Sequence, residues 1–137
     1  MSLPGNLQKG SELNHAAQVP SPYPQAAYQF VHNGVAFTIK RLHGPRLQNG
    51  VHRHITGQQL CDGLRELAIS QWGYLAQTVL RTWNVTTTAD FGRMVFILVR
   101  HGVLSLMPQD TLDDFRDVYD FSKAFESAYQ IRVPCPR

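Results

Sequence analysis

The chain has 137 residues, of which 43% are hydrophobic and 17% are charged. This composition suits one domain with a real core, and it excludes an intrinsically disordered chain, which combines low hydrophobicity with high charge. The net charge of +3 is a mild excess without the clustered basic residues of a dedicated nucleic-acid binder. The longest uninterrupted apolar run, residues 94–99, is far shorter than the ~20 residues that cross a bilayer.

Residues 1–22 are predicted to be a flexible tail, because they are rich in Gly, Pro, Ser, Asn and Gln and offer few apolar side chains. A single helical domain is expected over 23–130, and a frayed tail over 131–137. Residues 1–56 carry five basic residues against one acidic, whereas residues 110–137 carry six acidic against four basic. The two ends are therefore expected to attract each other or to present faces of opposite sign.

Two cysteines, Cys61 and Cys135, form neither a CxxC pair nor a disulfide framework. Cys61 lies in an apolar helical pattern and is expected to be a small buried hydrophobe. The first twenty residues contain no apolar run of secretory length. Together these features predict a cytoplasmic protein that is neither secreted by a standard signal nor membrane-spanning.

Residues 24–42 are predicted to form the first helix of the domain. Pro24 suits the first turn of a helix, where a missing N–H costs nothing. Apolar side chains recur at three- and four-residue steps at Tyr28, Val31, Val35, Ile39 and Leu42. A competing interpretation places a turn at Asn33-Gly34 before an alternating strand, but the longer stripe favours the helix.

Two further helices are predicted downstream, the second after residue 56 and the third over residues 74–83. Thr56 suits the N-cap of the second helix, and apolar residues follow it at helical spacing. Gly73 suits the position just after that helix, where a left-handed residue is common.

Residues 89–101 are predicted to form a fourth helix, capped by Thr88 and ended by Gly102. Its apolar residues wrap most of the circumference. We therefore expect neighbouring helices to enclose it as the buried centre of the domain.

The last part of the domain is harder to interpret. Residues 103–107 are short and apolar and suggest a strand, and Thr111 with Asp114 resembles a capping box at the start of another helix. A final helix is expected over 122–129. If 103–107 paired with 117–121, the order of elements would look like a winged-helix domain.

The predicted fold is therefore mainly α, a compact bundle of about five helices. A winged-helix-like variant with a short two-stranded β ribbon stays open. In that variant the helix at 89–101 would read nucleic acid, but it offers few strongly polar side chains to a groove, which argues against that function.

One candidate metal site combines His52, His54 and Cys61. Two imidazoles and a thiolate are a partial zinc set, although this spacing matches no established signature. The alternative is a polar loop followed by a buried cysteine.

A second candidate metal site is a run of five aspartates in the C-terminal third of the chain: Asp110, Asp113, Asp114, Asp117 and Asp120. On a helix this spacing would place several carboxylates on one side, where Asp113, Asp114 and Asp117 could hold Mg²⁺ or Ca²⁺. The alternatives are a solvated acidic face and a salt-bridge role toward Arg41, Arg46 or Arg53.

No nucleophile elbow, zinc-protease, P-loop or dinucleotide motif is present in the sequence. We expect no catalytic residues and no cofactor, and a non-enzymatic protein-interaction or regulatory module is the leading hypothesis. Its candidate partner surface combines the basic Arg46 and Arg53 with the acidic Asp113 and Asp117. Apolar residues left over after one small core could also serve a homodimer.

Three segments carry a resemblance to a known family: residues 57–68 (GQQLCDGLRELA), 88–92 (TADFG) and 114–121 (DFRDVYDF). Over roughly residues 23–128 the chain resembles the Verruc_Plancto-restricted proteins, a small bacterial family without an assigned function. The resemblance implies a bacterial, cytoplasmic protein and a helix over 24–42. It implies no catalytic residue, ligand or partner.

Overall fold

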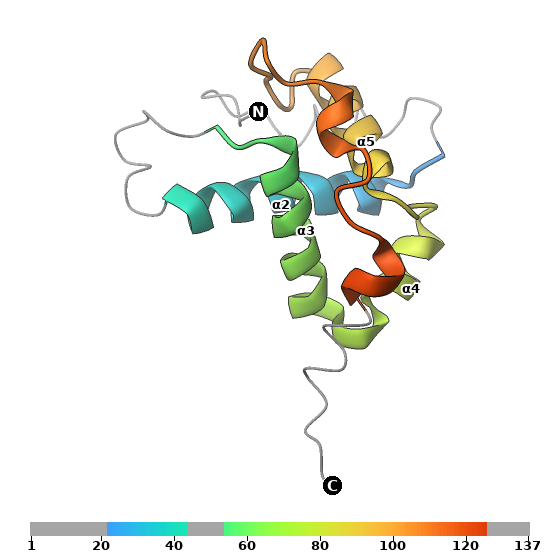
Figure 1. The fold of residues 1–137 in the computed structure, drawn as a ribbon. Helices are drawn as coiled ribbons and strands as arrows, with labels where there is room; N and C mark the ends of the chain where they lie inside the picture. The colour runs from blue at the N-terminus through green and yellow to red at the C-terminus, as the bar shows by residue number, and fades with distance from the viewer. Residues whose placement is uncertain (1–21, 44–53, 126–137) are drawn as a thin grey trace, which may run out of the picture.

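The computed structural model describes residues 22–43 and 54–125. This part of the chain is mainly α, as predicted, with four α-helices and two short 3₁₀ segments (Figure 1). The elements in chain order are α2 (Gln25–His43), α3 (Gly57–Trp72), η2 (Gly73–Leu75), α4 (Ala76–Thr82), α5 (Thr88–Arg100) and η3 (Leu112–Phe115). Residues 121–125 are also helical. The tails predicted at 1–22 and 131–137 fall outside these residues, apart from residue 22.

Helix α2 confirms the helical interpretation of residues 24–42. Asn33 and Gly34 lie inside the helix, so the competing turn is wrong. The stripe of apolar residues faces the core, because Tyr28, Val31 and Val35 are completely buried. Leu42, at the end of the stripe, is instead 46% exposed.

Figure 1 shows α2 lying across α3, and two glycines allow this close approach. A Cβ atom on Gly34 of α2 would stand 2.1 Å from Cδ2 of Leu64, and one on Gly63 of α3 would stand 1.8 Å from Oγ1 of Thr38. Larger residues at either position would push the helices apart.

Helix α3 begins where the sequence predicted. The Thr56 hydroxyl accepts a hydrogen bond from the Gln59 amide (3.1 Å), and the Gln59 side chain accepts one from the Thr56 amide (2.9 Å), which completes a capping box. The helix ends at Gly73, whose φ of 56° favours glycine. The third helix, expected over 74–83, is divided into η2 and α4.

Helix α5 begins one residue before the predicted start. Thr87 is its N-cap, in a reciprocal capping box with Asp90, and Thr88 is the first helical residue. The expectation that neighbours enclose α5 on all sides is wrong. Arg93 and Arg100 are exposed, and Phe96, Ile97 and Val99 are only partly buried. The helix has one buried face.

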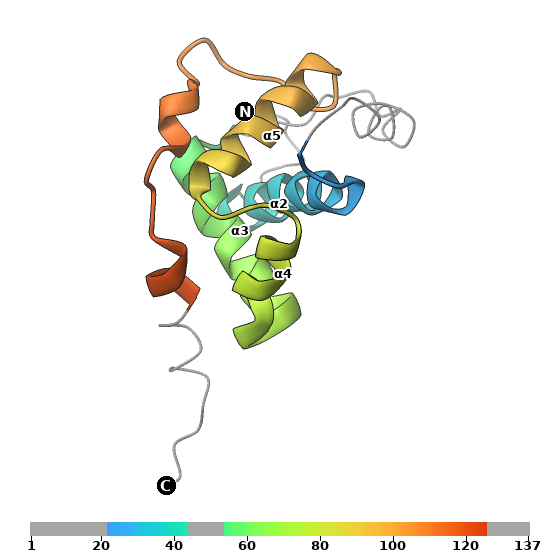
Figure 2. The same ribbon diagram turned by 90° about the vertical axis from the view of Figure 1, so that its right-hand side faces the viewer.

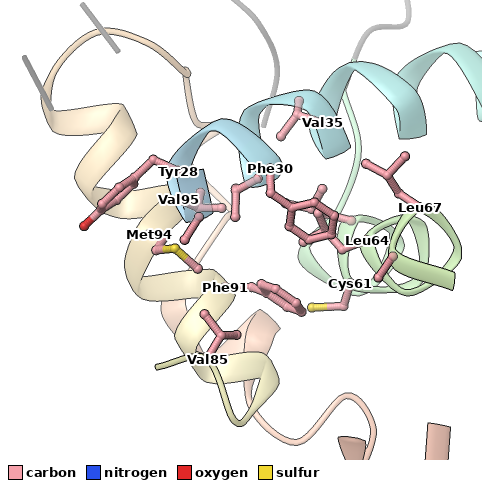
Figure 3. Packing of buried hydrophobic residues seen from close by; sticks show 14 of the residues in the cluster. Tyr28, Phe30, Val35, Cys61, Leu64, Leu67, Val85, Phe91, Met94 and Val95 are labelled. Atoms are coloured by element: carbon pink, nitrogen blue, oxygen red, sulfur yellow. The ribbon is translucent and has the colours of Figure 1, made fainter. Parts of the chain in front are cut away.

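Figure 3 shows that buried face within the core, where side chains of α2, α3 and α5 converge. Phe30 and Val35 come from α2, Cys61 and Leu64 from α3, and Met94 from α5. The core is therefore shared among three helices and is not built around α5 alone.

The winged-helix variant is wrong within the described residues. Residues 103–107 form no strand there, and residues 117–120 form no partner for one. The helix expected after Thr111 is also wrong. Its capping box with Asp114 exists, but it starts only the single 3₁₀ turn of η3. That turn stops because Arg116 is extended and Asp117 has a left-handed φ of 50°.

We call residues 112–125 the strap. Figure 2 shows it descending from η3 to the helical residues 121–125 along the outside of α3 and the start of α5. Phe115, Phe121 and Phe125 of the strap are buried in the core. The strap thus completes the domain by packing aromatic side chains, without forming a ribbon.

Candidate functional site

A buried carboxylate, Asp90, organises the start of α5. It is 6% exposed. Its Oδ1 accepts hydrogen bonds from the Tyr23 hydroxyl (2.5 Å) and from Arg93 (2.5 Å). Its Oδ2 accepts from the amides of Thr86 (2.9 Å) and Thr87 (3.1 Å). One carboxylate therefore joins the segment before α2 to the turn before α5.

These hydrogen bonds help to determine the protonation states of Asp90 and Tyr23. Burial alone would raise the pKa of Asp90, but the bonds from Tyr23, Thr86 and Thr87, together with the charge of Arg93, outweigh it and lower that pKa. Burial and the bond to Asp90 raise the pKa of Tyr23 to about 12. Asp90 thus stays ionised and Tyr23 stays a donor at neutral pH, which is the behaviour of a structural group.

The strap is held in place by buried contacts with α5 and α3. Phe115 lies against Gly92, where a Cβ atom would stand 2.8 Å from the Cβ of Phe115. The Thr88 hydroxyl donates to the Phe115 carbonyl (2.6 Å) and accepts from the Val118 amide (3.1 Å). The Tyr119 hydroxyl donates to the Cys61 carbonyl (2.6 Å).

A pocket of about 350 Å³ opens between this strap and the turn before α5. We call it the Asp117 pocket. Its lining consists of Thr86, Thr87, Asp117, Tyr119, Asp120 and Phe121. Asp117 and Asp120 are exposed. One oxygen of Asp120 accepts from the Ser122 amide (2.9 Å), and within residues 22–43 and 54–125 the Asp117 carboxylate has no hydrogen-bond or ion-pair partner.

A second, more open pocket of about 480 Å³ lies on the other side of Tyr119 and Asp120, which line both pockets. It carries both signs of charge, from Asp62 together with Arg65 and Lys123. The Arg65 Nε donates to the Ala124 carbonyl (3.2 Å), so this side chain also fastens the strap to α3.

Of the first predicted metal site, the structure describes His54 and Cys61, and these two side chains lie in different surroundings. His54 is exposed before α3, whereas Cys61 is completely buried inside that helix. Burial, and then the charge of Asp62, raises the pKa of Cys61 to about 12. His52 and Cys135 lie outside the described residues. Within those residues no three His, Cys, Asp or Glu side chains gather as a metal site would require.

The aspartate run does not lie on one face of a helix, so that expectation is wrong. Three of its members instead accept backbone hydrogen bonds nearby: Asp110 from Met107 (2.9 Å), Asp114 from Thr111 (3.0 Å) and Asp120 from Ser122 (2.9 Å). Asp113 forms an exposed ion pair with Arg116 (3.2 Å). Such side chains favour turns over helix interiors, which explains the local structure.

Of the predicted partner surface, the structure describes only the two acidic residues. Arg46 and Arg53 lie outside the described residues. Asp113 and Asp117 are both exposed on the strap, and Asp117 lines the Asp117 pocket.

Sequence reasoning missed the roles of Tyr23 and Asp90. The spacing of Thr87 and Asp90 is that of a capping box with Asp in place of Glu or Gln, and this signal could have indicated the bonds to Thr86 and Thr87. Nothing in the local pattern indicates Tyr23, whose contact with Asp90 spans 67 residues of sequence.

None of the helices in the described residues has both the length and the apolar character needed to cross a membrane. The chain matches no protein-family model, no curated protein and no solved structure. The resemblance to the Verruc_Plancto-restricted proteins stays a prediction.

Proposed function

We propose that this protein is a non-enzymatic protein-interaction module that engages its partner through the strap. The observation that carries the proposal is the contrast between the two sides of the strap. Its inner side is fixed by Phe115, by the Thr88 hydroxyl and by the Tyr119 hydroxyl, while Asp117 and Asp120 face solvent.

A surface that is ordered before binding loses less conformational entropy on association. The strap supplies such a surface without forming a regular element, because its aromatic side chains anchor it in the core. Tyr119 and Phe121 line the Asp117 pocket beside the two carboxylates. Tyrosine is enriched among the residues that contribute most to binding at protein interfaces.

Site-specific photo-cross-linking tests this proposal in cells that express the full chain. The photoreactive residue replaces Arg116, which is exposed on the strap, or Thr78, which is exposed on α4 and serves as the matched control. We expect one discrete cross-linked protein from position 116 and none from position 78. The captured protein is then purified and its binding to the chain is measured directly.

Equal labelling from both positions, or no cross-link from position 116, would contradict the proposal. Sedimentation of the purified chain separates a homodimer from a different partner, because a homodimer would change mass with concentration in the absence of any other protein.

A further inference from the structure

We infer that residues 129–133 of this chain dock onto an exposed apolar surface at η2. We call this surface, formed by Tyr74 and Leu75, the η2 surface. Three observations carry the inference: the exposure of the η2 surface, the place where the described chain ends, and the sequence of the residues that follow. The contact needs no partner on the strap, so it goes beyond the proposed function.

Apolar side chains at η2 face solvent. Tyr74 is 64% exposed and Leu75 is 49% exposed, and η2 contains no buried residue. Trp72, which directly precedes η2, is only partly buried. Single exposed apolar residues are normal on a protein surface. Three large apolar side chains within four residues are not single, and they point to a surface that another segment covers.

The η2 surface is held in a fixed position by its neighbours. The ring of Trp72 packs against those of Phe30 and Trp83, with centroids 5.1 Å and 5.4 Å away. On the other side of η2, Ala76 is completely buried. A segment that docks there meets a preformed surface, which lowers the entropy lost on docking.

The described chain ends close to the η2 surface. The Gln77 Nε2 donates to the Ser122 hydroxyl oxygen (3.5 Å), and Gln77 is two residues after Leu75. Figures 1 and 2 both show the helical residues 121–125 at the end of the molecule where α3 passes through η2 into α4. Phe125 is buried, so the residues that follow it start from a fixed point at this end.

Residues 126–137 lie outside the described residues, and part of their sequence alternates. Tyr129, Ile131 and Val133 are apolar, whereas Gln130 and Arg132 between them are polar. In an extended segment this period places the three apolar side chains on one face. The segment begins four residues after position 125, a linker of about 13 Å when extended, so it can reach only neighbouring surfaces.

The small area of the η2 surface favours the attached segment over a second copy of the chain or a separate protein. A stable interface between two proteins buries about 800 Å² on each partner, far more than two or three side chains supply. A short linker instead holds its segment at an effective concentration in the millimolar range. A contact that is too weak to hold a separate molecule is therefore sufficient for residues 129–133.

Disulfide cross-linking in the full chain tests the contact, because Cys135 lies two residues after the segment. Leu75→Cys places a thiol in the η2 surface, and Leu112→Cys is the matched control, since Leu112 is also 49% exposed but lies on η3. During oxidation with diamide, followed by peptide mass spectrometry, we expect the intramolecular disulfide to Cys135 to form about tenfold faster from position 75.

A change within the segment separates docking from mere proximity. In the Leu75→Cys protein, Ile131→Ser removes one apolar side chain from the docking face and should slow the cross-link about tenfold. Gln130→Ser alters the opposite face, leaves the linker and the thiols unchanged, and should leave the rate within about twofold. Far-UV circular dichroism of each variant should match that of the parent protein.

Equal rates from positions 75 and 112, equal rates for the two serine variants, or disulfides that form only between two molecules would each overturn the inference, and the last result would identify a second copy as the occupant. The proposed function fails separately. A partner captured at position 116 without the intramolecular disulfide leaves the interaction module standing. The disulfide without a captured partner leaves the docked segment standing alone.

Discussion

The side chain of Phe115 packs against Gly92 of α5, in the space that the Cβ atom of any other residue type at position 92 would occupy. This relationship fastens the strap to α5, because a Cβ atom at position 92 would stand 2.8 Å from both the Cβ and the Cγ of Phe115. The contact joins a helix to a segment that has little regular structure of its own.

Replacing Gly92 by alanine tests this contact against helix propensity. On propensity alone, alanine inside a helix would stabilise the protein by about 1 kcal/mol. We expect the clash with Phe115 to dominate and Gly92→Ala to lower the free energy of unfolding by about 2 kcal/mol, measured by urea denaturation. Thr78→Ala, an exposed helix substitution without such a neighbour, should not destabilise the protein. A stabilised Gly92→Ala variant would show that the strap does not press on α5.

The Thr88 hydroxyl gives a second test of the strap. Thr88→Val keeps the shape of the side chain but leaves the Phe115 carbonyl and the Val118 amide without their partner. We expect a loss of about 2 kcal/mol and faster hydrogen exchange at the Val118 amide. Thr82→Val removes a hydroxyl bond of the same length from an exposed site, to the Val79 carbonyl, and should cost much less. Unchanged exchange at Val118 would contradict the assignment.

Asp90 predicts how stability depends on pH. Its native pKa is lowered, so its contribution is present above the pKa of an unfolded aspartate, about 3.9, and is lost as pH falls through the native value. We expect Asp90→Asn to cost about 2 kcal/mol at neutral pH, and the gap to wild type to narrow below about pH 4. Asp113→Asn, in an exposed pair, should change stability little. A gap that stays constant down to pH 2 would refute the role of ionised Asp90.

Cys61 should be inert in the native protein. Its burial raises the pKa of the thiol to about 12, and the thiolate is the reactive form. In a Cys135→Ser background, we expect an aromatic disulfide reagent to label Cys61 only as urea unfolds the chain. A cysteine introduced at the exposed position 78 should react at once. Rapid labelling of Cys61 in native buffer would mean that α3 and the strap separate often.

The sequence predicted the elements whose causes are local. Helix α2 follows from a long apolar stripe, and α3 follows from the cap at Thr56 and the stop at Gly73. The start of α5 was misplaced by one residue, because Thr87 and Thr88 are chemically equivalent as caps and only the structure shows that Thr88 serves the strap instead.

Residues 103–121 could not be predicted in this way, because distant contacts determine their structure. Phe115 needs Gly92, Val118 needs Thr88, and Tyr119 needs the Cys61 carbonyl 58 residues earlier. The apolar spacing suggested a helix after Thr111 and a strand at 103–107. That spacing indicates which side chains are buried, but it does not determine the backbone conformation. The Asp117 pocket depends on the same contacts, so the sequence indicated its acidic residues but not their grouping.

The bond between Tyr23 and Asp90 also determines where the chain can be shortened. A truncated protein that starts at Gln25 would retain every residue of the four described helices. Its buried Asp90 carboxylate, however, would lack the hydrogen bond from the Tyr23 hydroxyl. Between two truncated proteins that differ only in whether they retain Tyr23, the one that retains it should therefore yield more folded material, and the one that begins just after it should aggregate or be degraded.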